Sequence, residues 1–216
     1  MASIDHDLHP SNAARLPAET AAATGDAVKW GNSAPLALAA FAVTTFMLSM
    51  VNSGIVNIGV LPAVFAVALM FGGLTQLVAA FFQFRIGNTF AGVLFGTFGA
   101  FWLSLYALAE FFLKDVPVAQ AGHALGLFLY AFGIFTVWIL AASFRTNILV
   151  VAALADLVAT FFVLGAGNWG GNATVIHAGG YLGLVAAALA AYLSCAEVCE
   201  ASYGHPVLPV WSLAKR

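Results

Sequence analysis

The stretch "NILVVAALADLVATFFVLGA", residues 147–166, is apolar over almost its whole length and carries one charged side chain, Asp156. About 20 apolar residues are enough for a helix to cross the hydrocarbon core of a bilayer. A carboxylate near the middle of such a helix costs at least ~2.5–3.5 kcal/mol on insertion scales. This stretch therefore predicts a membrane-spanning helix that bears one unfavourable polar group.

The whole chain has the composition of a membrane protein. Of its 216 residues, 62% are hydrophobic and 7% are charged, and its mean hydropathy is +0.98. Soluble domains carry about 25% charged residues. The net charge of −2 leaves no basic surface for nucleic acid, so no nucleic-acid partner is expected.

Six stretches are long and apolar enough to cross a bilayer, and short polar or glycine-containing segments separate them. They are residues 34–56, 60–84, 89–113, 121–143, 147–166 and 173–197. The predicted fold is an all-α integral membrane protein with six transmembrane helices. The expected organisation is a disordered cytoplasmic tail (residues 1–29), a six-helix transmembrane domain (residues 30–200) and a short cytoplasmic tail (residues 201–216).

The distribution of basic residues predicts how the helices are oriented in the membrane. With six spans both termini lie on one side of the membrane, and six of the seven Lys and Arg residues fall on that side. Lys114 is the exception. Because cytoplasmic loops are enriched in Lys and Arg, we expect both termini in the cytoplasm.

An asparagine begins each odd-numbered span. Asn32, Asn88 and Asn147 recur at intervals of 56 and 59 residues. Ordinary N-capping explains each of them, since an Asn side chain accepts from backbone N–H groups that a helix start leaves unpaired. Three helix starts at one mouth would also present partial positive charge and attract an anion.

Several motifs resemble the acetate uptake transporter family, which includes bacterial acetate/succinate permeases and fungal relatives. They are "GNSAPLALAAFAVTTFMLSMVNSG", "GNTFAGVLFGTFGAFW", "GNWGGNATVIHAGGYLGL" and "YGHPVLP", and together they cover roughly residues 31–210. Ser33 and Ala37 depart from the family signature, where a Pro and a Gly stand.

The resemblance implies a homohexamer surrounded by membrane lipid. In each protomer six helices surround a central pathway. It implies transport of acetate and similar small carboxylates, possibly including succinate, by a channel or a proton symporter in the bacterial inner (plasma) membrane.

The resemblance also implies a pore constriction formed by Phe41, Phe98 and Leu157, with Phe98 standing where the family has a Tyr. The spacing supports this, because the three residues follow their helix-start asparagines by nine or ten positions. At about 1.5 Å per residue they reach a depth of roughly 14–15 Å, near the middle of the membrane. An apolar constriction suits the methyl group of acetate or neutral acetic acid better than a bare carboxylate.

Polar residues of the pathway are expected at its two mouths. The candidates are Asn32, Asn88 and Thr89 at the cytoplasmic mouth, Thr44 and Thr45 just beyond Phe41, and Asn168, Asn172 and His177 outside. For His177, a packing role and a proton-relay role both remain open. No cofactor, metal site or catalytic residue is predicted, and Cys195 and Cys199 are interpreted as small residues compatible with lipid.

Asp156 has two open interpretations. It can be a neutral hydrogen-bond donor between helices, or a titrating group beside the pathway that carries a proton or repels carboxylates. Adjacent residues are about 100° apart around a helix, so Asp156 does not point where Leu157 points.

Two other functions are found among membrane proteins with six spans. A formate/nitrite-type channel for another small anion or neutral solute has the same helix count, but its motifs are not visible. An intramembrane serine enzyme fails because Ser143, the serine of the fourth span, is far in depth from His177.

Overall fold

The computed structural model describes residues 30–213. The predicted tail at residues 1–29 and the last three residues lie outside the described part of the chain.

Within residues 30–213, six helical spans are long and apolar enough to cross a membrane. The first is α1 (Ala34–Asn52). The second joins η1 (Ile58–Val60), α2 (Leu61–Val67), the π-helical segment η2 (Ala68–Thr75) and α3 (Gln76–Arg85). The third joins α4 (Thr89–Ala107), the π-helical η3 (Leu108–Phe112) and η4 (Leu113–Asp115), and the last three are α5 (Val118–Ser143), α6 (Ile148–Trp169) and α7 (Ala173–Tyr203). The prediction of six spans is confirmed, and α7 continues six residues beyond its predicted end.

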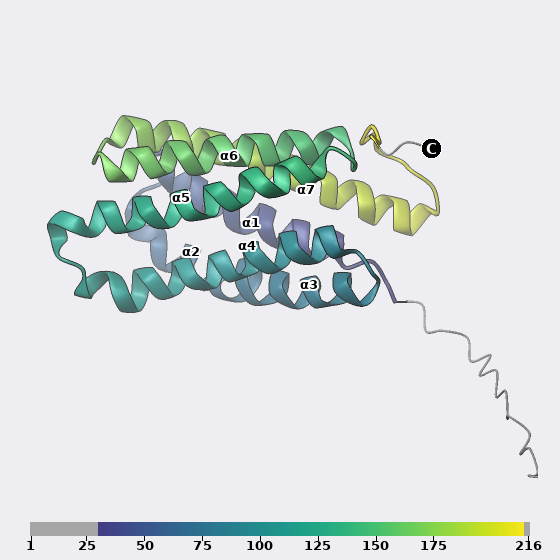
Figure 1. The fold of residues 1–216 in the computed structure, drawn as a ribbon, viewed down its shortest axis with the longest axis horizontal. Helices are drawn as coiled ribbons and strands as arrows, with labels where there is room; N and C mark the ends of the chain where they lie inside the picture. The colour runs from purple at the N-terminus through teal and green to yellow at the C-terminus, as the bar shows by residue number, and fades with distance from the viewer. Residues whose placement is uncertain (1–29, 214–216) are drawn as a thin grey trace, which may run out of the picture.

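The six spans form a ring in chain order, and Figure 1 shows the helices running alongside one another along the long axis of the molecule. Each span contacts the next one, although α4 and α5 touch little, and α7 packs along α1 to close the ring. The helices α1, α4 and α6 all begin at the same end of the bundle, which we call the asparagine end. The chain beyond α7 turns back at this end, toward the start of α6.

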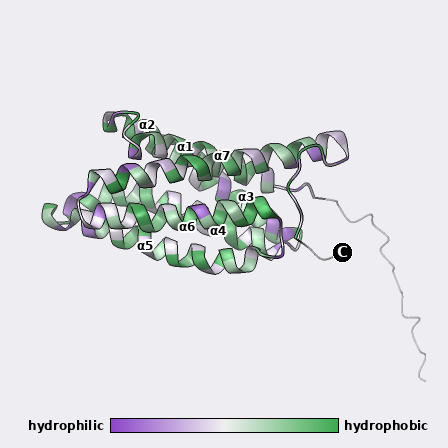
Figure 2. Ribbon diagram, turned by 90° about the horizontal axis from the view of Figure 1, so that it is seen from above, coloured by the Kyte–Doolittle hydropathy of each residue, from purple (hydrophilic) through white to green (hydrophobic). Residues whose placement is uncertain are grey.

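The outer surface of the ring is apolar. Hydrophobic residues extend along the helices and hydrophilic ones gather mostly at their ends (Figure 2). Large apolar side chains such as Phe46, Phe81 and Trp138 are half or more exposed. Such a surface is compatible with lipid and not with water, so the chain is a multi-pass membrane protein.

Glycines allow α7 to approach its neighbours closely. Gly180 packs against the backbone at the end of α1, where an added Cβ would lie 2.5 Å from Asn52 C and 2.6 Å from Ser53 Cα. Gly183 faces the side chain of Ser49 on α1, and Gly179 faces Leu164 on α6. Small residues at such contacts are the usual way in which helices associate within a bilayer.

We predict that Gly180→Ala destabilises the protein by about 2 kcal/mol, because the added methyl group meets backbone atoms that cannot rotate away. Gly96→Ala is the control. Its Cβ would have Ala80 Cβ at 3.6 Å as its nearest neighbour, so it should keep or slightly raise the stability. Thermal unfolding of the purified variants in detergent measures both effects. Equal melting temperatures for the two variants would contradict this account of the contact between α1 and α7.

Candidate functional site

Two cavities enter the ring from opposite ends. The asparagine-end cavity has a volume of about 680 Å³ and the opposite-end cavity about 430 Å³. The residues that line both of them are Phe41 on α1 and Leu157 on α6. These two side chains therefore stand between the cavities.

Phe98 on α4 completes the apolar layer between the cavities. Its ring lies 5.6 Å from that of Phe41 and stacks at 6.2 Å on that of Phe161, measured between centroids. Phe98 lines the asparagine-end cavity, and Phe161 lines the opposite one. The side chains of Phe41, Phe98 and Leu157 are all buried, with at most 8% exposure. The structure thus brings the three predicted constriction residues together at the boundary of the two cavities.

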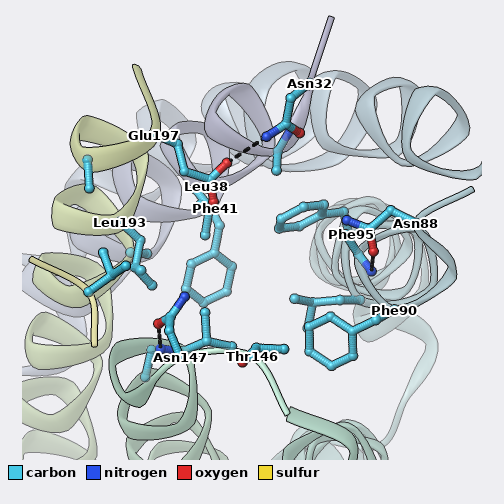
Figure 3. A pocket seen from close by; sticks show the side chains of 18 of the residues that line it. Asn32, Leu38, Phe41, Asn88, Phe90, Phe95, Thr146, Asn147, Leu193 and Glu197 are labelled. Atoms are coloured by element: carbon cyan, nitrogen blue, oxygen red, sulfur yellow. Dashed lines mark hydrogen bonds between the residues drawn. The ribbon is translucent and has the colours of Figure 1, made fainter. Parts of the chain in front are cut away.

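Helix starts form the polar wall of the asparagine-end cavity, which Asn32, Asn88 and Asn147 all line (Figure 3). Asn88 Oδ1 accepts from Ala91 N at 3.1 Å, and Asn147 Oδ1 accepts from Val150 N at 2.9 Å. Asn32 precedes the N-cap residue of α1 by one position and accepts from Ala34 N at 2.9 Å. The capping expected from the sequence is present at all three helix starts.

A hydrogen-bonded group of side chains connects four spans at this end. Asn32 Nδ2 donates to Glu197 Oε2 on α7 at 2.9 Å, a bond drawn in Figure 3. The side-chain amide of Gln83 on α3 lies 2.8 Å from Asn32 Oδ1 and 3.0 Å from Asn88 Nδ2. Glu197 and Glu200 line the cavity together. This acidic pair is not among the residues predicted from the sequence.

Gln76, at the start of α3, is another cavity residue that was not predicted from the sequence. It lines the asparagine-end cavity, its side chain is completely buried, and neither of its amide atoms has a hydrogen-bond partner among the described residues. Leaving a buried polar group unpaired costs about 1–3 kcal/mol. In this structure the amide is covered, so it reaches a carboxylate in the cavity only when the side chain rotates. Gln76 lies seven residues before Gln83 in an otherwise apolar span. Two polar side chains at this helical spacing are a sequence signal from which the site could have been predicted.

Two predicted pathway residues line the opposite-end cavity. Thr45 is buried, and its hydroxyl has no partner among the described residues. Asn168 donates from Nδ2 to Leu164 O at 2.8 Å.

Four predicted pathway residues line neither cavity. Thr44 bonds Ala40 O at 2.8 Å and faces Gly72 of η2. Thr89 is exposed in the first turn of α4. Asn172 caps α7 by accepting from Val175 N at 3.2 Å, and His177 packs its ring against Gly54. Their roles in transport remain predictions, and the contact with Gly54 favours the packing role of His177.

Asp156 also lines neither cavity. It is partly exposed, and it faces the backbone of Ala186 where α6 packs on α7. Its Oδ2 atom has no hydrogen-bond partner among the described residues. This position places Asp156 between helices and away from the cavities.

No group of three or more His, Cys, Asp or Glu residues in the described chain is arranged to hold a metal ion. Cys195 Sγ and Cys199 Sγ lie 3.9 Å apart on the last turns of α7.

Residues 17–215 match the family model described as the GPR1/FUN34/yaaH family. The chain belongs to this family. This confirms the resemblance that the motifs predicted.

Several relatives of the chain are named as transporters or channels. It is 34% identical over 185 residues to the succinate-acetate/proton symporter SatP of Escherichia coli, covering 84% of this chain and 96% of the relative. It is 34% identical to acetate permease A of Emericella nidulans, covering 86% of this chain and 67% of the relative. A solved structure of the bacterial acetate channel SatP matches with a TM-score of 0.78 and 32% identity, covering 84% of this chain and 99% of the SatP chain. None of these names describes an enzyme, in agreement with the prediction from the sequence.

We predict that Gln76→Leu keeps or raises the melting temperature, because it removes a buried polar group that has no partner. Gln83→Leu is the matched control. It should lower the stability by about 1–3 kcal/mol, because Asn32 and Asn88 would lose the amide that lies between them. Differential scanning calorimetry in the same detergent compares the melting temperatures of the two variants. A large destabilisation by Gln76→Leu would mean that its amide is bonded in the folded protein.

Proposed function

We propose that this protein transports acetate and similar small carboxylates, possibly including succinate, across the membrane through its two cavities. The observation that carries the proposal is the apolar layer of Phe41, Phe98 and Leu157 between them. The names of the relatives support acetate as the substrate. In this proposal the protein is a homohexamer in the bacterial inner membrane. Its asparagine end faces the cytoplasm.

The chemistry of the asparagine-end cavity suits a monocarboxylate. The Gln76 amide can donate to its carboxylate, and the apolar layer accepts its methyl group. A fully ionised carboxylate pays a large desolvation penalty in an apolar layer, whereas neutral acetic acid pays much less. The constriction therefore favours small substrates whose acidic groups are protonated as they pass.

The acidic pair at the asparagine end favours proton-coupled transport over passage of the bare anion. Glu197 and Glu200 line the cavity that the substrate enters, and in their ionised form they repel a free carboxylate. A substrate that moves with a proton avoids this repulsion. A channel for the anion is the alternative mechanism.

Uptake of labelled acetate into proteoliposomes tests the function, with and without an imposed pH gradient and with a protonophore as control. We expect uptake above that of empty vesicles, inhibition by excess propionate or succinate, and stimulation by the pH gradient. Uptake no greater than in empty vesicles would refute acetate transport. Passage of formate or nitrite without acetate would favour a channel of the formate/nitrite type. In the same assay Gln76→Leu should lower acetate flux about tenfold, because it removes a hydrogen bond to a charged group.

Enlarging the constriction should accelerate transport. We predict that Leu157→Ala raises the acetate flux about threefold or more, or admits larger carboxylates, because it removes apolar bulk between the cavities. Leu154→Ala is the control. Leu154 lies one turn earlier on α6 and lines only the asparagine-end cavity, not the opposite one. Initial rates for acetate, propionate and butyrate measure the effect. Equal rates and selectivity in the two variants would remove Leu157 from the pathway.

We predict that Asp156→Asn keeps acetate flux within about twofold and leaves its pH dependence unchanged, because Asp156 lines neither cavity. Glu197→Gln, which changes a cavity residue in the same way, should alter the pH dependence. Flux measured from pH 5 to 8 compares the two variants with the parent protein. A changed profile in Asp156→Asn would show that Asp156 titrates during transport.

A further inference from the structure

Arg85 is a basic residue at the asparagine end that takes no part in the cavity there. It is the last residue of α3, its side chain is exposed, and it does not line the cavity. The acidic residues Glu197 and Glu200 line that cavity instead, and no carboxylate among the described residues pairs with Arg85. A guanidinium can donate two parallel hydrogen bonds to a phosphate or a carboxylate. Arg85 is therefore available to an anion on the outside of the bundle.

The ring of Trp30 holds the Arg85 guanidinium in place. The guanidinium carbon lies 5.8 Å from the centroid of the Trp30 ring, which is within the range of a cation–π interaction. The ring of Phe82, three residues before Arg85, lies 5.5 Å from that of Trp30. Trp30 and Phe82 are 44% and 38% exposed, so this group of side chains stands at the surface. Stacking covers one face of the guanidinium and leaves its N–H groups accessible at the edge.

An exposed apolar stripe leads from Arg85 along α3 toward the middle of the membrane. Phe81 and Val78 precede Arg85 by four and seven residues, so all three share one face of α3. The side chains of Phe81 and Val78 are 66% and 46% exposed. Gln76 and Gln83, on the opposite face of α3, are completely buried. The helix thus presents to lipid a row of apolar side chains that ends in a cation.

This arrangement matches a phospholipid with an anionic headgroup. Its phosphate can accept hydrogen bonds from Arg85 and from the indole N–H of Trp30, while an acyl chain lies along Phe81 and Val78. Tryptophan is enriched at membrane interfaces because its ring is apolar and its N–H is polar. A small soluble anion would use only the polar end of this surface and leave the stripe uncovered.

Arg145 has the same charge at the same end of the bundle, without this arrangement. It is exposed in the turn between α5 and α6. Of the Lys and Arg residues in the described part of the chain, Arg85 is the one that lies over an aromatic ring. Arg145 therefore separates the effect of charge alone from that of the group formed with Trp30.

We propose that Trp30 and Arg85 bind the headgroup of an anionic phospholipid whose acyl chain lies along the exposed face of α3. This inference goes beyond carboxylate transport and does not depend on it, because Trp30, Phe81 and Arg85 line neither cavity. Since Trp30 precedes α1 and Arg85 ends α3, a lipid bound to both should hold the start of α1 against the second span.

The test compares two lipids that have the same chains and different headgroups. Dioleoylphosphatidylglycerol, which is anionic, and dioleoylphosphatidylcholine, which is zwitterionic, are titrated into the purified protein in a non-ionic detergent. Native mass spectrometry counts the retained lipid. We expect the parent protein to bind the anionic lipid about fivefold more tightly, the contribution of one basic residue near an anionic membrane surface. Arg85→Gln should abolish this preference, and Arg145→Gln, the matched control, should keep it.

The other outcomes overturn the inference. They are no preference in the parent protein, equal loss of preference in Arg85→Gln and Arg145→Gln, and displacement of the anionic lipid by an equal concentration of inorganic phosphate. The last would show that the site binds a soluble anion and not a lipid. Acetate uptake is measured separately, so either proposal can fail while the other stands.

Melting temperatures in detergent alone verify that the variants fold. Should Arg85→Gln not fold, Trp30→Leu provides a second test, because it removes the stacking partner and keeps the charge. We expect it to lower the preference for the anionic lipid about twofold or more. An unchanged preference in Trp30→Leu would overturn the inference.

Discussion

The contact between α1 and α7 joins the first span to the last and so closes the ring around the two cavities. Within lipid no hydrophobic force draws helices together, so close packing and hydrogen bonds between helices must hold the ring closed. At the opposite end Gly180 meets the backbone of Asn52 and Ser53. Toward the asparagine end Ser194 Oγ donates to Pro35 O at 2.7 Å. Because these are the first and last spans, the cavities at the centre of the ring exist only when the whole chain has folded.

The sequence predicted the features that depend on length and depth. Apolar length identified six spans, and the asparagines identified the starts of three helices. The family resemblance named Phe41, Phe98 and Leu157, their nearly equal spacing from those starts predicted that they would lie at one depth, and they meet at one layer. Each of these features follows from counting residues along a helix axis.

Features that depend on rotation about a helix axis were harder to predict. A span that is apolar all round gives no indication of which face is inward, and neighbouring residues differ by about 100°. The neighbours Thr44 and Thr45 illustrate the problem, since Thr45 lines a cavity and Thr44 packs on Gly72. Gln76 was missed for a related reason, because an apolar span gives no indication that the face carrying Gln76 and Gln83 points inward. The position of residues 204–213 beside the start of α6 depends on bonds that local patterns do not reveal.

The π-helical segment Ala68–Thr75 has a consequence for how this chain can tolerate a change in length. A π-helical turn accommodates an extra residue within an otherwise α-helical span. Losing one residue there would restore an α-helix without rotating Leu61–Val67 against Gln76–Arg85, so Gln76 and Gln83 would keep their inward positions. The same loss anywhere else in the span would turn one half of it by about 100° relative to the other. Single-residue deletions in the second span should therefore be confined to this turn among natural variants of the chain.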